Sequence, residues 1–266
     1  MTPRFHAPHL DPASALVTLS EDESHHLAHV MRLGPGASVR VFDGRGGEWL
    51  GCVARVERGR ATVQLGNPVE SAAPERTLRI VLAQAVLKAD HMEAVVRDAT
   101  MMGVAAIQPL ATAHTAVSAR RLGDPRLRDR WQRIAVSSAK QCGRAVVPAV
   151  LAPLEFAAFV GGDLPRLRLL LVEPSTGVAA ASPLETPARD AAGEDVVVAI
   201  GPEGGWSGGE VRTAREAGFL PWSLGRLTLR ADAVPVAALA ILAHVWESGL
   251  GPPAPSPDLP RSETRR

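Results

Sequence analysis

The sequence has few cysteines, no long apolar run and almost no net charge, and each shortage excludes a class of protein. Only Cys52 and Cys142 are present, so there is no disulfide framework, and their separation matches no zinc-binding pattern. No apolar run reaches the ~20 residues that span a bilayer, and residues 1–10 lack the apolar core of a signal peptide. We therefore expect a cytoplasmic protein in a reducing compartment, with no membrane partner.

A bound metal is also not expected. His25 and His29 stand four residues apart in a predicted short helix, a spacing that could suit a metal ion. No cysteine or carboxylate stands at a supporting distance, so we interpret them as two unrelated histidines.

Basic residues are not in excess overall, but they are in excess locally. The 29 Lys and Arg residues nearly balance 28 Asp and Glu residues, so net charge does not indicate a nucleic-acid-binding protein. Between residues 120 and 144, however, eight basic residues face two acidic ones. Five of them follow one face of a predicted helix or stand just past its end: Arg126, Arg130, Arg133, Lys140 and Arg144. Such a stripe can neutralise RNA phosphates, although a solvated helix face is the alternative.

The order of sequence patterns predicts two domains of different class. Short alternating segments at 38–44, 48–57 and 60–66, separated by glycine-rich turns, predict a small antiparallel β-barrel in residues 1–70. Residues 71–77 have the composition of a linker. From residue 78 to 249, strands alternate with helices, which predicts an α/β domain with a mostly parallel sheet. Residues 250–266, rich in proline and charge, predict a disordered tail.

A strand, a loop and a helix start are compressed into residues 195–211, DVVVAIGPEGGWSGGEV. The apolar run at 196–200 is typical of a strand that is buried on both faces. Ser207 and Glu210 have the spacing of a capping box, which predicts a helix start at this point.

The glycines between this strand and helix favour a ligand. Gly201, Gly204 and Gly205 carry no Cβ, so a ligand could approach the backbone closely. The loop matches no phosphate fingerprint, and Glu203 would repel a polyphosphate, which favours a nucleoside without phosphates. A plain strand-to-helix turn is the alternative.

A second pattern follows at residues 223–242, SLGRLTLRADAVPVAALAIL. An extended piece ends at Leu224 and Gly225, and an apolar helix is predicted from 231 to 246. Asp232 is the candidate N-cap of this helix, with Pro235 in its first turn. An apolar helix taken alone indicates only a core element.

Taken together, the two patterns resemble a known family. GPEGG-x-S-x-x-E followed by LG-x-x-x-LR-x-[ED] is similar to the SPOUT-class methyltransferases, and most similar to the bacterial 16S ribosomal RNA (uracil-N3) methyltransferases, called RsmE. The resemblance extends to Lys88 and Glu93 in VLKADHMEAVVRDATMMG and to residues 140–148, KQCGRAVVP. It covers the chain up to about residue 249.

The resemblance implies a fold, a cofactor and partners. The first domain would be an RNA-binding PUA-like barrel, and the second a SPOUT domain with a trefoil knot. The cofactor would be S-adenosylmethionine and the protein a homodimer. The substrate would be 16S ribosomal RNA, expected in the assembled small subunit. The implied cofactor-binding residues lie on three loops: Val172, Glu173 and Pro174; Ile200, Gly201, Pro202, Gly204 and Gly205; Leu224, Gly225, Leu227 and Leu229.

Methyl transfer to N3 requires that the weakly acidic imide proton leaves and that the negative charge on O2 and O4 is stabilised. Arg230 is the candidate for stabilising this charge, because a guanidinium is a strong donor but no base at ordinary pH. Glu203 is the candidate for holding the cofactor or its loop. The alternative for Arg230 is an ion pair with Asp232.

The sequence departs from the family in one place. The usual LGPRILR-x-ET reads LGRLTLRAD, with Arg226 for proline, Leu227 for arginine, and Asp232 with Ala233 for Glu-Thr. The backbone cofactor site should survive these changes, whereas the target is less certain. Three alternatives therefore stay open: methylation of another RNA position, including a ribose 2′-oxygen; an inactive RNA-binding assembly factor; and a dinucleotide-dependent oxidoreductase, which lacks its phosphate fingerprint here.

Overall fold

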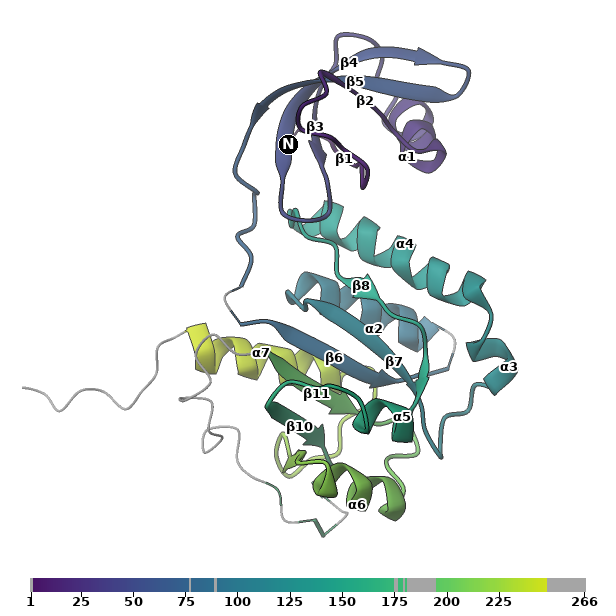
Figure 1. Ribbon diagram of the computed structural model, residues 1–266, viewed down its shortest axis with the longest axis vertical. Helices are drawn as coiled ribbons and strands as arrows, with labels where there is room; N and C mark the ends of the chain where they lie inside the picture. Colours follow the sequence, from purple (N-terminus) through teal and green to yellow (C-terminus); the bar gives the residue numbers. More distant parts are fainter. Residues whose placement is uncertain are drawn as a thin grey trace, which may run out of the picture.

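The computed structural model describes residues 2–76, 78–88, 90–174, 177–178, 180 and 195–247. A small N-terminal sheet sits beside a larger α/β unit, and helix α4 lies between the two sheets (Figure 1). The predicted tail at 250–266 lies outside the described residues.

The N-terminal domain is a five-stranded sheet in the order β1-β3-β4-β5-β2. Its strands are β1 (Arg4–His6), β2 (Leu16–Thr18), β3 (Ser38–Phe42), β4 (Glu48–Glu57) and β5 (Arg60–Pro68). The three predicted strands are confirmed as β3, β4 and β5. The prediction of a wholly antiparallel domain is wrong at β1, which pairs in parallel with β3. At three residues each, β1 and β2 are too short to show a period of two.

A short helix covers one side of this small sheet. Helix α1 (Glu21–His25) continues as a π-helical turn, η1 (His26–Val30). Only half of a capping box forms at the start of α1: Ser20 Oγ accepts a hydrogen bond from the Glu23 amide at 3.3 Å. The Glu23 carboxylate instead accepts from Lys140 Nζ at 2.8 and 2.9 Å, so it serves the contact between the domains.

The larger domain is built on a seven-stranded sheet in the order β12-β10-β11-β6-β7-β8, with β9 also paired to β7. Every strand pair in it is parallel, which confirms the predicted fold class. The strands are β6 (Ile80–Ala85), β7 (Ala106–Ala111), β8 (Ala149–Val150), β9 (Leu154–Glu155), β10 (Leu167–Leu171), β11 (Val196–Ile200) and β12 (Leu220–Trp222). The trefoil knot stays a prediction.

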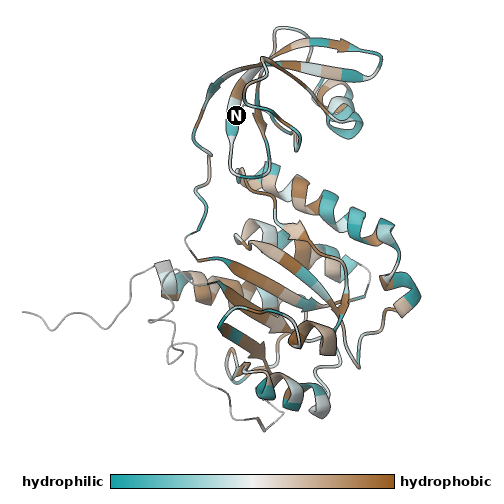
Figure 2. Cartoon of the chain, in the orientation of Figure 1, coloured by the Kyte–Doolittle hydropathy of each residue, from teal (hydrophilic) through white to brown (hydrophobic). Residues whose placement is uncertain are grey.

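Helices cover both faces of this sheet, so its central strands are apolar on both sides (Figure 2). The helices are α2 (Asp90–Met101), α3 (Ala119–Leu122), α4 (Pro125–Cys142), α5 (Phe156–Val160), α6 (Gly208–Glu216) and α7 (Val234–Glu247). One core contains side chains of α2, α4 and α7, and the other contains side chains of α5 and α6. Every residue of β11 is buried, as its apolar run predicted.

Helix α7 begins three residues later than predicted. Residues 231–233 form a turn in which the amides of Ala233 and Val234 donate to the carbonyl of Arg230. Pro235 is in the first turn, as expected. The Asp232 carboxylate, the predicted N-cap, is bonded by the Arg230 guanidinium.

Charged side chains connect the two domains. Arg4 of β1 is 8% exposed and forms an ion pair with buried Glu48 at 2.9 Å. The same guanidinium donates to the carbonyls of Ala139, Lys140 and Arg144 at 2.9 to 3.1 Å. Arginine at the carboxyl end of a helix also interacts favourably with the helix dipole. These contacts fix the end of α4 against the small sheet.

Among the described residues no helix is long and apolar enough to cross a bilayer.

Candidate functional site

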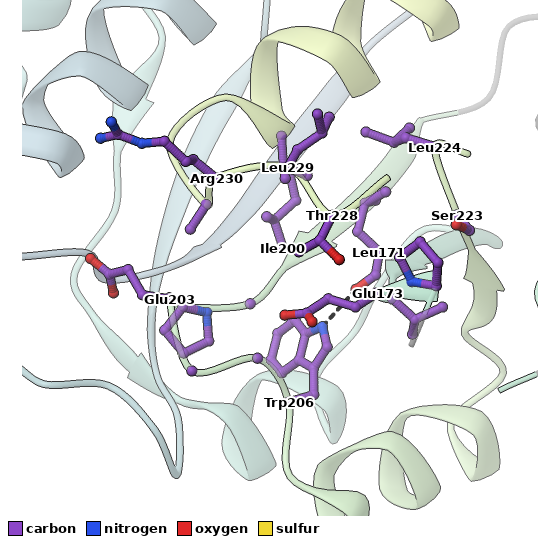
Figure 3. Close-up of a pocket in the computed structure, with 18 of the residues that line it drawn as sticks. Leu171, Glu173, Ile200, Glu203, Trp206, Ser223, Leu224, Thr228, Leu229 and Arg230 are labelled. Carbon is purple, nitrogen blue, oxygen red and sulfur yellow. Dashed lines mark hydrogen bonds between the residues drawn. The ribbon is translucent and has the colours of Figure 1, made fainter. Parts of the chain in front are cut away.

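A cavity of about 480 Å³ opens at the carboxyl ends of strands β10, β11 and β12. In open parallel α/β sheets, ligands bind at this edge, and the volume falls in the range of small-molecule sites. Leu229, Thr228 and Leu224 lie on one side of it and Trp206 and Glu173 on the other (Figure 3).

The three loops predicted from the sequence meet at this cavity. All but one of the twelve predicted cofactor-binding residues line it: Val172, Glu173, Pro174, Ile200, Gly201, Pro202, Gly204, Gly205, Leu224, Leu227 and Leu229. Gly225 does not line it; this residue has a φ of 139°, which favours glycine. Arg230 and Glu203 also line the cavity. Cofactor binding by these residues stays a prediction.

The glycines of the loop after β11 are needed by its packing. A Cβ on Gly204 would lie 2.9 Å from Cβ of His114, and one on Gly201 would lie 3.3 Å from the Trp206 ring. Gly205 has a φ of 67°, in the left-handed region. The loop therefore follows a path that larger residues would disturb.

Hydrogen bonds to neighbouring segments hold this loop in place. His114, in the loop after β7, places Nδ1 at 2.9 Å from the carbonyl oxygen of Gly204 and 3.1 Å from that of Gly205. The Trp206 indole N–H donates to the carbonyl of Leu171 at 2.8 Å. The buried Gln84 amide donates to the carbonyl of Gly201 at 3.4 Å. A loop fixed from three sides is preorganised for a ligand.

Arg230 and Glu203 flank the same end of the cavity (Figure 3). The Arg230 guanidinium, 72% exposed, bonds both oxygens of Asp232 at 3.1 Å. The ion pair named as the alternative reading of Arg230 is therefore present. One Glu203 oxygen accepts from the Lys88 amide at 3.2 Å. Glu203 thus holds its loop against the start of α2.

Sequence reasoning missed several residues of the cavity wall. Trp206 and Ser223 stand inside the two motifs, but nothing about either residue in the sequence indicates contact with a ligand. His91 stands 139 residues before Arg230 of the second motif, so only folding brings it to the site. Thr228 was a variable position in the pattern.

Four of the five predicted RNA-binding residues lie on α4 and Arg144 lies just past its end. None of them lines the cavity, and they divide into two groups. Arg126 is 89% exposed and paired with Asp124, and Arg130 is 56% exposed and paired with Glu93. Arg133 is also exposed. These three remain predictions.

The prediction is corrected for Lys140 and Arg144. Arg144 is 4% exposed; it bonds Glu75 at 2.6 Å and the carbonyl of Thr100 at 2.7 Å. Lys140 pairs with Glu23 of the small domain. Lys140 lies at the end of α4 that docks on the small domain, and its charge serves that contact. The Arg144 guanidinium is buried beside Glu75 and carbonyls of the larger domain. Neither residue therefore belongs to a solvent-facing stripe.

Metal binding has no support in the described part of the chain, where no group of three or more His, Cys, Asp or Glu side chains could hold an ion. The rings of His25 and His29 contact each other with their centroids 4.8 Å apart and their planes tilted by 38°.

Two family models match the sequence. An RNA methyltransferase domain matches residues 74–243, and an RNA methyltransferase PUA domain matches residues 19–66. The first match alone covers more than half of the chain.

Named relatives of the chain are also RNA methyltransferases. The ribosomal RNA small subunit methyltransferase E of Synechocystis sp. is 37% identical over 88% of this chain and 75% of its own length. The protein of that name from Mycobacterium bovis is 28% identical over 92% of this chain and 93% of its own length. The crystal structure of the Neisseria gonorrhoeae ribosomal RNA small subunit methyltransferase E, bound to S-adenosyl methionine, aligns with a TM-score of 0.82. It is 28% identical and covers 92% of this chain and 98% of its own.

Proposed function

The chain belongs to the RNA methyltransferase family that includes the ribosomal RNA small subunit methyltransferase E proteins, and we propose that it methylates N3 of one uridine in 16S ribosomal RNA. S-adenosylmethionine is the methyl donor. The observation that carries the proposal is the convergence of three loops on one cavity beside Arg230.

The cavity suits this cofactor chemically. Its wall combines backbone of a glycine-rich loop with the apolar side chains of Leu171, Ile200 and Leu224. The adenine of the cofactor needs apolar faces and backbone hydrogen bonds. S-adenosylmethionine carries no phosphate groups, so the carboxylates of Glu173 and Glu203 do not repel it as they would repel a polyphosphate. When bound, the cofactor supplies an electrophilic methyl group on a sulfonium.

Arg230 stabilises the charge that develops on the uracil. Its guanidinium stands at the cavity mouth, largely in solvent, where an incoming base can meet it. A uracil that loses its N3 proton carries negative charge on O2 and O4, and a guanidinium donor lowers the free energy of that anion. Asp232 holds the guanidinium at the mouth before RNA binds.

The exposed part of the α4 stripe binds RNA. Arg126, Arg130 and Arg133 face solvent on the amino-terminal half of α4. The other end of this helix docks on the small domain, which family matching identifies as a PUA domain. Each Lys or Arg that neutralises a phosphate releases counterions, so binding should weaken as salt rises. The substrate is the assembled small subunit in the cytoplasm, and the enzyme acts as a homodimer.

The test is methylation of undermethylated small ribosomal subunits with labelled S-adenosylmethionine, followed by digestion and identification of the labelled nucleoside. We expect 3-methyluridine at a single site. Another methylated nucleoside would keep the enzyme class and overturn the target. Cofactor binding without any transfer would favour the assembly-factor alternative, and equal methylation of naked 16S RNA would contradict the assembled substrate.

A further inference from the structure

The His91 imidazole stands between Glu203 and Arg230 at the mouth of the cavity. His91 is the second residue of α2 and lines the cavity wall. Its Nδ1 is 3.7 Å from a Glu203 oxygen, and its Nε2 is 3.3 Å from an Arg230 guanidinium nitrogen. The His91 ring therefore contacts both Glu203, which holds the loop after β11, and Arg230, which is assigned to the reaction.

These two contacts fix which ring nitrogen carries the proton. A guanidinium has only N–H donors, so Nε2 must present its lone pair to Arg230. The proton of the neutral ring is then on Nδ1, which faces the Glu203 carboxylate. A carboxylate beside one ring nitrogen and no proton on the other is the arrangement that orients a histidine as a base.

We propose that His91 is the general base that removes the uracil N3 proton. The proposal rests on the proposed function, because only a ring-nitrogen target carries this proton. The N3–H bond breaks, an Nε2–H bond forms, and the electron pair stays on N3, O2 and O4. The uracil N3 then takes the methyl group while the sulfonium electron pair returns to sulfur. The imidazolium later loses its proton to water.

The positions of the three side chains allow this sequence. The N3 lone pair that receives the methyl is the one that held the proton, so the imidazolium must turn aside first. His91 is 45% exposed and Arg230 is 72% exposed, so both have room to move at the mouth. When the uracil enters the cavity, the Arg230 guanidinium that contacts His91 Nε2 moves to a uracil oxygen. This movement frees the Nε2 lone pair to accept the N3 proton.

Charged groups around His91 act on both of its forms. From other elements it faces Glu203 and Arg230, with Asp232 behind Arg230. On its own segment stand Lys88 and Asp90. The Glu203 carboxylate stabilises the imidazolium that forms, whereas the guanidinium opposes it until it engages the uracil anion.

The test compares wild type, His91→Ala and His91→Gln in single-turnover methyl transfer to small subunits at saturating cofactor from pH 5.5 to 9. With the base present, the rate should rise with pH and then level off. Without it, the rate should fall about 100-fold or more at neutral pH. The remaining rate should keep rising tenfold per pH unit, because it depends on uracil that ionises without help.

Adding imidazole distinguishes a base from a residue that only supports the structure, because imidazole in solution can replace a missing base but not a missing structural contact. We expect it to restore the His91→Ala rate in proportion to the concentration of neutral imidazole. His9→Ala, at an exposed position outside the cavity, is the matched control and should keep the wild-type profile.

The outcomes separate this proposal from the proposed function. Wild-type 3-methyluridine formation with an unchanged pH profile in both His91 variants would overturn the role of His91 alone, as would failure of imidazole to restore the rate. Absence of 3-methyluridine with the wild type would overturn the proposed function and the base with it. His91→Gln keeps an acceptor for Arg230, so its loss of the plateau would support proton removal over positioning.

Discussion

The glycine loop after β11 depends on single side chains that stand outside the cavity. His114 bonds two of its carbonyls, and its Cβ leaves no space for a larger residue at Gly204. The sequence marked the glycines but not their partner. A histidine 90 residues away from its acceptor produces no pattern in a single sequence, because the contact depends on the path of two loops.

We expect His114→Ala to weaken S-adenosylmethionine binding about fivefold, the value of one hydrogen bond of about 1 kcal/mol. The substitution frees the Gly204 and Gly205 carbonyls and loosens the loop. Titration calorimetry would measure the change.

Two amides provide matched controls for His114. An asparagine amide nitrogen takes the position of the histidine Nδ1, whereas a glutamine amide nitrogen takes that of Nε2. His114→Asn should therefore bind the cofactor better than His114→Gln. Equal affinities for all three variants would mean that the loop holds its shape without this contact.

At the scale of helices and strands, the sequence predicted those elements whose patterns are local. The apolar run of β11 and the capping box of α6 both act within a few residues. Helix α5 and strands β8, β9 and β1 are too short for a period to show, and they form because neighbouring elements supply partners. The basic stripe of α4 was predicted correctly as a helix face, but its last turn is covered by the other domain.

The capping box of α6 should make a measurable contribution to the free energy of unfolding. Ser207 Oγ accepts from the Glu210 amide at 3.2 Å, and the Glu210 carboxylate accepts from the Ser207 amide at 2.8 Å. Ser207→Ala should lower the free energy of unfolding by about 1 kcal/mol in urea denaturation, with faster amide exchange over residues 208–216.

Two further variants test that reading of α6. Ser207→Asp keeps an acceptor at the N-cap and should stay close to wild type. Thr213→Ala removes an exposed hydroxyl that bonds the Gly209 carbonyl at 3.1 Å, and it should change stability by less than about 0.5 kcal/mol. A loss as large in Thr213→Ala as in Ser207→Ala would refute the special role of the cap.

At the scale of the whole molecule, the domain contact contains histidines that cannot easily become charged. Burial, with the Lys140 ammonium adding to it, lowers the pKa of His6 to about 4. Burial and Lys140 also lower the pKa of His26, whose Nδ1 is 3.0 Å from the Lys140 nitrogen. The unfolded chain therefore binds more protons than the native protein between about pH 6.5 and 4.

The contribution of these two histidines to the free energy of unfolding should consequently be constant above about pH 6.5 and fall as the pH drops toward 4. The loss from His6 is about 2 kcal/mol once its partial solvent exposure is allowed for. Urea denaturation at pH 7, 5.5 and 4.5 would measure it. His6→Gln should reduce the slope, whereas His9→Gln, at an exposed position, should leave it unchanged; an equal slope in all three proteins would contradict the assignment.

The buried Arg4 also bears on how the protein is made. The carbonyls that it bonds belong to residues 135 to 140 positions further along the chain. At a synthesis rate of 5–20 residues per second, those partners leave the ribosome roughly 7 to 28 s after Arg4 does. For that time a nascent small domain has a charged docking surface without its counterpart. The strand that is translated early thus reaches its final set of contacts late, and the growing chain must keep this surface from binding elsewhere.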